Sequence, residues 1–249
     1  MKSAEWGDTA PMAAYLAVWR AYRRYFRYSV TGLENMPTDR AALIVGYHGR
    51  PVAYDLCILL VEIYERHGYF PHAVVHGAMM QVPTLRWLAK GLRFVAGDGD
   101  DIADAVKAAE HVVVLPGGTR EGCRSHQHRY QVAWGPRTGY LRLAAKYGLP
   151  VVPVAAHGVD DAYVGLNDGY VWGKRLKMPA RLPFWLGLGP AGLWPASPPF
   201  PVRIHQRVGA PIHLPRDLDT KDQQAMMHQH QRVRAAVQSL LDEGKKACA

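Results

Sequence analysis

The chain places a histidine and a carboxylate near the junction of a predicted strand and a predicted helix. Residues 41–45 are apolar and predict a buried strand, and the apolar residues after Pro51 recur at the spacing of one helical face. His48 therefore lies where a strand ends and a helix begins, the edge at which open α/β sheets bind ligands. An imidazole there suits general-base chemistry near neutral pH. Asp55, the nearest carboxylate along the chain, is the local candidate to orient the ring.

A glycine-rich turn is the second motif that could do chemistry. Residues 111–115 form the clearest predicted strand, which runs directly into a turn of sequence Pro-Gly-Gly-Thr-Arg-Glu-Gly. Adjacent glycines let backbone amides approach an anion, and an arginine adds a planar fork of donors. The Gly-Lys-Ser/Thr ending of a nucleotide P-loop is missing. The alternatives are a plain turn and a substrate-binding segment made of Gly117, Gly118, Thr119, Arg120 and Glu121.

Predicted strands and helices alternate along most of the chain. Further strands are expected at 73–76, 91–95, 149–155 and 202–208, and further helices at 82–90, 134–147 and 222–241. This alternation favours an α/β fold with a mixed central sheet flanked by helices. No linker or internal repeat stands out, so residues 29–249 are expected to form one domain.

Residues 1–28 are expected to contribute an amphipathic helix, regular from about residue 13. Helical spacing puts four aromatic side chains on one face and arginines beside it: Tyr15, Trp19, Tyr22, Phe26, Arg20 and Arg24. An interfacial helix uses aromatic rings at the boundary of the lipid headgroups and arginines among the phosphates. The alternative is a terminal helix that packs its aromatic face on the domain core.

Residues 178–202 form an apolar stretch with seven prolines, which exclude a regular helix or a central strand. Arg181 is its only charged residue, and Phe184, Trp185 and Trp194 are among its aromatic residues. Such a loop can be buried against the sheet, cover an apolar pocket, or meet lipid or a partner. We expect the three aromatic residues to contribute to a membrane interface.

The charge and cysteine content limit the partners and the compartment. The formal net charge is +9, which favours nucleic acid, anionic lipid or phosphorylated substrates and coenzymes. Three cysteines without a framework spacing, and no secretory signal, predict a cytoplasmic protein. No apolar run is long enough to cross a bilayer, so we expect peripheral association with the inner face of a membrane.

These motifs together resemble the glycerolipid acyltransferase superfamily and are most similar to its mono- and diacylglycerol acyltransferase-like branch. The likeness covers about residues 30–244. His48 and Asp55 look like the family's first block, although six residues separate them where the family usually has four. Residues 115–121 resemble its third block, with Gly117 in place of a glutamate, and residues 152–154 resemble its fourth. An arginine that ends the second block is replaced by Gly97, which favours a neutral acceptor.

The resemblance implies acyl transfer from a thioester, acyl-CoA or acyl carrier protein, to a glycerolipid hydroxyl at an anionic membrane surface. His48 would act as general base, Asp55 would orient it, and Arg120 would bind a phosphate group. Arg50 in the first block and Pro153 in the fourth would contact substrate. Neither a cofactor nor a metal ion is expected.

Several alternatives stay open at this point. His48, one of 12 histidines, could be structural. A lipid hydrolase is a rival, but no Gly-x-Ser-x-Gly elbow occurs. Nucleic-acid or lipid binding without catalysis would also suit the charge, although no recognisable nucleic-acid module accompanies it. The pairs His126 and His128, or His228 and His230, could hold zinc but lack further ligands at the usual spacing.

Overall fold

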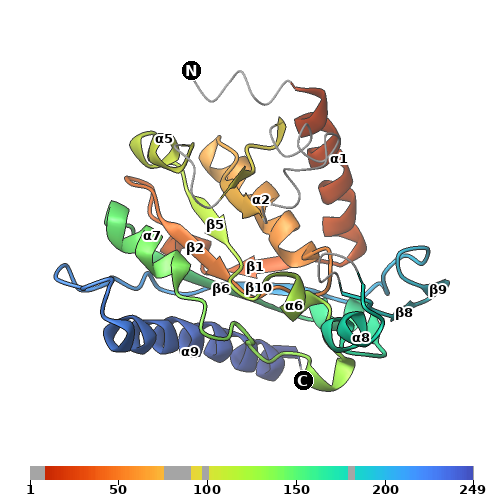
Figure 1. The fold of residues 1–249 in the computed structure, drawn as a ribbon. Helices are drawn as coiled ribbons and strands as arrows, with labels where there is room; N and C mark the ends of the chain where they lie inside the picture. The colour runs from red at the N-terminus through yellow and green to blue at the C-terminus, as the bar shows by residue number, and fades with distance from the viewer. Residues whose placement is uncertain (1–8, 76–90, 97–100, 179–182, 249) are drawn as a thin grey trace.

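The computed structural model describes residues 9–75, 91–96, 101–178 and 183–248, and it contains a seven-stranded sheet (Figure 1). From one edge to the other the strands are β1 (Ser29–Thr31), β10 (His205–Val208), β6 (Val151–His157), β2 (Leu43–Gly46), β5 (Val112–Val114), β3 (His72–Val75) and β4 (Val95–Ala96). β6, β2, β5, β3 and β4 are parallel, whereas β10 is antiparallel to β6 and β1 is parallel to β10. The predicted mixed central sheet is confirmed.

Helices cover both faces of this sheet, with α1 (Ala10–Tyr25) and α2 (Tyr54–His67) on one face and α7 (Gly139–Tyr147) and α9 (Gln223–Cys248) on the other (Figure 1). Side chains alternate along β2, so Leu43 and Val45 belong to the cluster that includes α9, while Ile44 packs with residues of α1 and α2. Strands buried on both faces read as continuous apolar runs, which explains why these strands were predictable.

Several element bounds differ from prediction. α2 begins at Tyr54 instead of next to Pro51, and the predicted helix 134–147 begins only at Gly139. The glycine-rich turn contains a short helix, α6 (Gly118–Gly122), and α5 spans Asp101–Lys107. In the described residues, the 3₁₀ helices η2 (Leu33–Asn35), η3 (His126–His128) and η4 (Val159–Ala162) connect other elements. The predicted helix 82–90, and Gly97 and Arg181, lie outside the described residues.

The aromatic face of α1 packs against the domain and does not face outward. Tyr15 and Phe26 are buried, and Trp19 and Tyr22 are half-buried. The rings of Tyr22 and Phe26 each contact the Tyr54 ring of α2, with centroids 5.3 and 5.2 Å apart. The helix therefore packs its aromatic face on the core, as in the alternative, and burial corrects the membrane-interface prediction for Tyr15 and Phe26. For Trp19 and Tyr22 that role stays a prediction.

The arginines of α1 also make intramolecular contacts. Arg20 pairs with Glu65 of α2 at 2.8 Å, and Arg23 pairs with Glu62 and Glu65 at 2.9 and 2.7 Å. Arg24 is exposed. These ion pairs attach α1 to α2 beside the aromatic contacts, so Arg20, one of the two arginines expected to meet lipid phosphates, already has an acidic partner.

The apolar stretch 178–202 contributes to a second, three-stranded antiparallel sheet of β7 (Val164–Gly165), β8 (Gly187–Gly189) and β9 (Gly192–Leu193). A short helix, α8 (Gly169–Arg175), precedes the stretch. Trp185 is buried, while Phe184 and Trp194 are half-buried. A membrane contact for Trp185 is therefore wrong, because its ring fills the space beneath this sheet.

Within the described part of the chain, none of the helices combines the length and the apolar character that crossing a bilayer would require.

Candidate active site

The candidate site lies at the carboxyl end of three neighbouring parallel strands. β2 lies between β5 and β6, and all three run in the same direction. The segments that follow them must therefore meet at one edge of the sheet. His48 follows β2, α6 follows β5, and Asp160 of η4 follows β6.

The turn after β2 has a strained backbone that fixes the position of His48. Arg50 and Ala53 adopt left-handed conformations with φ of 46° and 51°, and α2 starts only after them. The residues beyond the usual four-residue spacing therefore form a turn before the helix.

Glu121 of α6 ties this turn to the neighbouring segment. Its two carboxylate oxygens accept hydrogen bonds from the backbone amides of His48, at 2.9 Å, and Ala133, at 2.8 Å. The side chain is buried, and this burial raises the pKa of the Glu121 carboxyl to about 7. Glu121 thus holds the candidate base in place from inside the protein, and its predicted contact with substrate is corrected to this structural role.

Two glycines of the motif are required by close approaches. A side chain at Gly122 would place its Cβ 2.8 Å from Nδ1 of His48. At Gly117 a Cβ would lie 2.2 Å from Oε2 of Glu121. Gly118 has a φ of +52° and nothing within 4 Å of the same position, so its glycine is needed for the turn and not for packing.

His48 is almost completely enclosed, with 9% of the residue exposed. Burial, and then the positive charge of Arg124, lower the pKa of His48 to about 4. The ring is therefore neutral at pH 7 and able to accept a proton. Its Nδ1 atom is buried without a hydrogen-bond partner.

Asp55 lies in the first turn of α2 and is also buried. Burial raises the pKa of its carboxyl to about 8, and its Oδ1 atom has no hydrogen-bond partner. No hydrogen bond joins His48 to Asp55 in the residues that the structure describes. Within the segment 48–55, Nδ1 of His48 and Oδ1 of Asp55 are the two buried side-chain atoms left unpaired.

The raised pKa of Asp55 predicts a pH-dependent stability. Between the ordinary pKa of 3.8 and about 8 the unfolded chain loses this proton while the folded chain keeps it. The free energy of unfolding therefore falls as the pH rises through this window. Asparagine has no such proton to lose, so the free energy of unfolding of Asp55→Asn does not fall for this reason. The free energy of unfolding of Asp55→Asn minus that of the wild type should therefore be about 1–3 kcal/mol larger at pH 8 than at pH 5.

Urea unfolding at the two pH values measures this difference. The exposed Asp217→Asn serves as the control and should show the same relative stability at both. An Asp55→Asn difference that does not change with pH would contradict the burial argument.

A buried ion network lies beneath the His48 turn. Asp160 is fully buried between two arginines, with its Oδ1 atom 3.8 Å from Nε of Arg50 and 3.7 Å from Nη2 of Arg124. Its other oxygen accepts hydrogen bonds from the hydroxyl of Tyr47 and, at 2.7 Å, from the amide of Tyr130. The two arginines lower the pKa of Asp160 despite its burial.

Arg50 and Arg124 use their guanidinium groups within the protein. Arg50 is 0% exposed and donates to the backbone oxygens of Asp160, at 2.6 Å, and Arg124, at 3.1 Å. Arg124 donates to the backbone oxygen of His48 at 3.1 Å. The prediction that Arg50 contacts substrate is therefore wrong: it holds the turn that carries His48.

Pro153 likewise belongs to the interior. It is buried in β6, where its carbonyl accepts the amide of Gly209 at 2.9 Å and its ring packs against that residue. Its predicted contact with substrate is corrected to a packing role.

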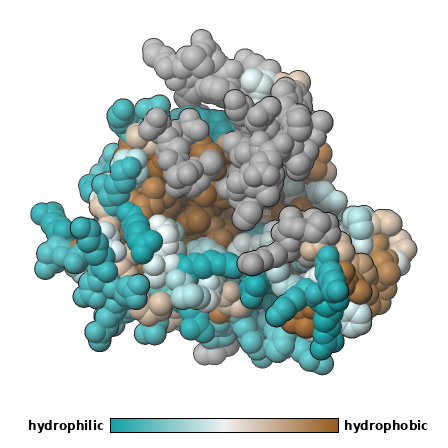
Figure 2. Space-filling view, viewed as in Figure 1, coloured by the Kyte–Doolittle hydropathy of each residue, from teal (hydrophilic) through white to brown (hydrophobic). Residues whose placement is uncertain are grey.

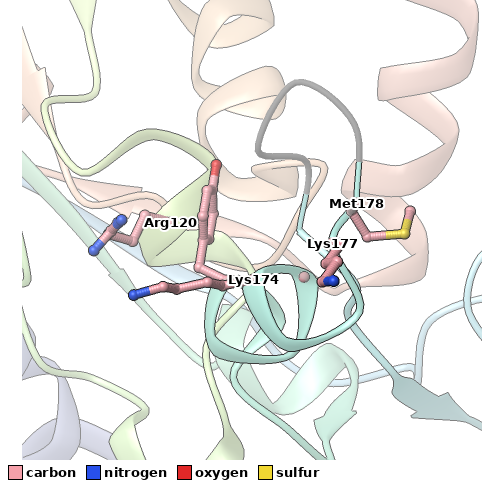
Figure 3. A pocket seen from close by; sticks show the side chains of 6 residues that line it. Arg120, Lys174, Lys177 and Met178 are labelled. Carbon is pink, nitrogen blue, oxygen red and sulfur yellow. The ribbon is translucent and has the colours of Figure 1, made fainter.

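A basic pocket of about 460 Å³ opens on the outer side of α6. Arg120 of α6 and Lys174 of α8 extend their charged ends to the same side (Figure 3). The full lining is Arg120, Tyr170, Gly173, Lys174, Lys177 and Met178.

Contacts between α6 and α8 shape this pocket. The guanidinium of Arg120 lies 4.9 Å from the centre of the Tyr170 ring, and the Tyr170 hydroxyl is 2.5 Å from the Thr119 hydroxyl. Arg120 and Thr119 are exposed, and their role in substrate binding stays a prediction. Sequence reasoning missed Lys174 and Lys177, because α8 was not predicted.

Comparisons with known proteins agree on one family. A family model described as diacylglycerol acyltransferase matches residues 7–249. The human protein named "DGAT1/2-independent enzyme synthesizing storage lipids" is 24% identical over 237 residues, covering 92% of this chain and 68% of its own. Human 2-acylglycerol O-acyltransferase 3 is 27% identical over 250 residues, covering 93% and 72%. The chain spans about two thirds of the length of the storage-lipid enzymes it matches.

A solved structure shares the fold. The crystal structure of the 1-acyl-sn-glycerophosphate acyltransferase PlsC from Thermotoga maritima has a TM-score of 0.56 and 16% sequence identity to this chain. The match covers 93% of this chain and 78% of that one. At this identity the likeness concerns the arrangement of the elements and not the substrate.

Proposed function

The chain belongs to the diacylglycerol acyltransferase family, and from this premise we propose that it transfers a fatty acyl group from a thioester to a glycerolipid hydroxyl. The family assignment agrees with the resemblance inferred from the sequence. The observation that carries the proposal is a neutral, buried imidazole at the carboxyl edge of the sheet, whose turn is bonded to α6, the helix that carries Arg120 of the basic pocket.

His48 is the proposed general base. A glycerolipid hydroxyl is a poor nucleophile at pH 7, so the base removes its proton as the oxygen attacks the thioester carbonyl. The new ester bond forms, the thiolate leaves, and the proton held by His48 passes to the thiolate. The lowered pKa of His48 keeps the ring free of a proton beforehand.

Asp55 is the proposed orienting residue. Both Nδ1 of His48 and Oδ1 of Asp55 lack partners in the free protein, and catalytic hydrogen bonds often tighten only when substrate is bound. Asp55 holds its proton at pH 7, so it can orient the ring as a neutral hydrogen-bonding group, and it would stabilise the imidazolium formed during transfer only after losing that proton. A positioning role of this kind predicts that Asp55→Asn lowers kcat and leaves KM nearly unchanged.

The basic pocket is the proposed site for the phosphate groups of the acyl donor. Arg120, Lys174 and Lys177 provide three positive charges around it. Acyl-CoA carries a pyrophosphate and a further phosphate, which such a cluster would bind. The donor's acyl end would then reach His48, because α6 carries Arg120 on its outer side and Glu121, bonded to the His48 turn, on its inner side.

The experiment that tests the proposed function is transfer of labelled acyl groups from acyl-CoA to a panel of acceptors. Monoacylglycerol and diacylglycerol should give product, and lysophosphatidic acid should give less, since the second block lacks its arginine. Absence of product with every acceptor would overturn the proposal.

The donor site is tested in the same assay. Lys174→Ala should raise KM for acyl-CoA about tenfold, because a charge-assisted contact is worth about 1.5–3 kcal/mol. Lys146→Ala, which removes another exposed lysine beside a tyrosine ring, is the matched control and should leave KM unchanged. Equal KM values for the two variants would place donor binding elsewhere.

A further inference from the structure

Exposed apolar side chains concentrate in one part of the described surface. Eight large apolar side chains are exposed in the described residues, and six of them belong to residues 166–193. These are 40–55% exposed: Leu166, Val171, Trp172, Leu176, Leu188 and Leu193. Figure 2 shows hydrophobic surface over the region of α8, β8 and β9, with hydrophilic residues beside it. Contiguous apolar surface of this kind is typical of an interaction site.

The small sheet carries its large side chains on the outside. Leu188 of β8 pairs with Leu193 of β9 and with Val164 of β7, and Leu166 follows two residues after Val164. Residues two apart share a face, so three exposed leucines lie together on the outer face of this sheet.

Glycines form the opposite face and determine this orientation. A Cβ at Gly165 would lie 2.5 Å from the backbone oxygen of Arg124, and one at Gly187 would lie 2.2 Å from the ring of Trp185. The inner face thus approaches the buried ion network too closely for any side chain. The leucines therefore cannot turn inward, and 40–55% of each stays exposed.

Positive charge surrounds these apolar side chains. Lys174 and Arg175 lie on α8, and Lys177 follows it. The helix α8 itself contains no acidic residue. A basic rim of these three residues matches an anionic surface, and near such a surface each basic residue contributes to binding.

We propose that α8 and the outer face of the β7–β8–β9 sheet, named here the docking face, bind an anionic lipid bilayer. The apolar side chains enter the boundary between headgroups and acyl chains, and the lysines and arginines contact lipid phosphates. The basic pocket shares α8 with this face, so it would open at the bilayer surface, where acyl chains can enter. The inference deepens the proposed function, on which it rests for the role of the bilayer as the source of acceptor.

Sedimentation with vesicles tests the docking face. The full chain is mixed with phosphatidylcholine vesicles with or without phosphatidylglycerol, and we expect binding that needs the anionic lipid and weakens with salt. Val171→Ser should weaken binding, whereas Val18→Ser should not. The two valines are 48% and 49% exposed, but Val18 lies on α1. Val171→Ser, Leu176→Ser and Leu188→Ser together should weaken binding about tenfold or more.

Transfer to a dispersed short-chain acceptor separates docking from catalysis and folding. The triple variant should keep wild-type transfer to this soluble acceptor and lose transfer to acceptor embedded in vesicles. Docking is wrong if the folded triple variant binds vesicles as the wild type does. It is also wrong if the wild type binds no vesicles. If the wild type is then a dimer and the triple variant a monomer, this face is an interface between two copies of the chain. Vesicle binding without any transfer would refute the proposed function alone.

Discussion

His48→Ala should lower the rate of acyl transfer by about 10²–10⁴-fold, the usual contribution of a positioned general base. The loss should appear in kcat, because His48 is the proposed base for the acceptor proton and does not line the basic pocket proposed for the donor. Steady-state transfer from acyl-CoA to monoacylglycerol measures both parameters. With a base whose pKa is about 4, protonation of His48 should not lower kcat/KM of the wild type between pH 8 and about pH 5.

His111 offers a matched control for this substitution. It is fully buried, and burial lowers its pKa to about 4 as well. However, it precedes β5, and its Nδ1 atom accepts the amide of Ala42 at 3.2 Å. His111→Asn should therefore retain transfer once folding is verified by circular dichroism. Equal losses in folded His48→Ala and His111→Asn would show that neither ring takes part in chemistry.

Asp160→Asn should destabilise the protein by about 3–5 kcal/mol, the cost of leaving buried charges without their partner. Arg50 and Arg124 are both buried and both face this carboxylate. A loss of this size is a large part of the stability of an ordinary domain. The midpoint of urea unfolding should fall accordingly. Transfer should fall with it, because both arginines also hold the turn of His48.

The adjacent Asp161 is the control. Its side chain is 41% exposed, 3.6 Å from Arg129, and it accepts the Tyr130 hydroxyl at 2.7 Å. Asp161→Asn should cost about 1 kcal/mol or less, as for other exposed ion pairs. If the two substitutions shift the unfolding midpoint equally, the buried network does not contribute as described.

The sequence predicted those parts of the site that depend on local patterns. Apolar runs buried on both faces identified β2, β5 and β6, and the positions just after them located His48 and Arg120 at the edge of the sheet. Asp160 could have been found by the same reasoning, because it follows β6 as His48 follows β2. The network itself was not predictable, since Arg50 and Asp160 are 110 residues apart.

The pattern of apolar side chains along the sequence did not reveal which surface, protein or lipid, these side chains contact. The aromatic face of α1 would look the same on a membrane as on α2, and only the partners Tyr54, Glu62 and Glu65 decide between the two. For the same reason, the apolar stretch 178–202 was correctly noticed, but its buried and exposed residues could not be distinguished. α8 is too short for helical periodicity to identify, so Lys174 and Lys177 were missed.

The close packing of Glu121 over Gly117 limits which residue can begin this turn. A Cβ at Gly117 would lie 2.2 Å from Oε2 and 2.6 Å from Cβ of Glu121. Any side chain at Gly117 would therefore displace the carboxylate that accepts the amides of His48 and Ala133. The absence of a side chain at this one position thus keeps the turn of the candidate base attached to α6.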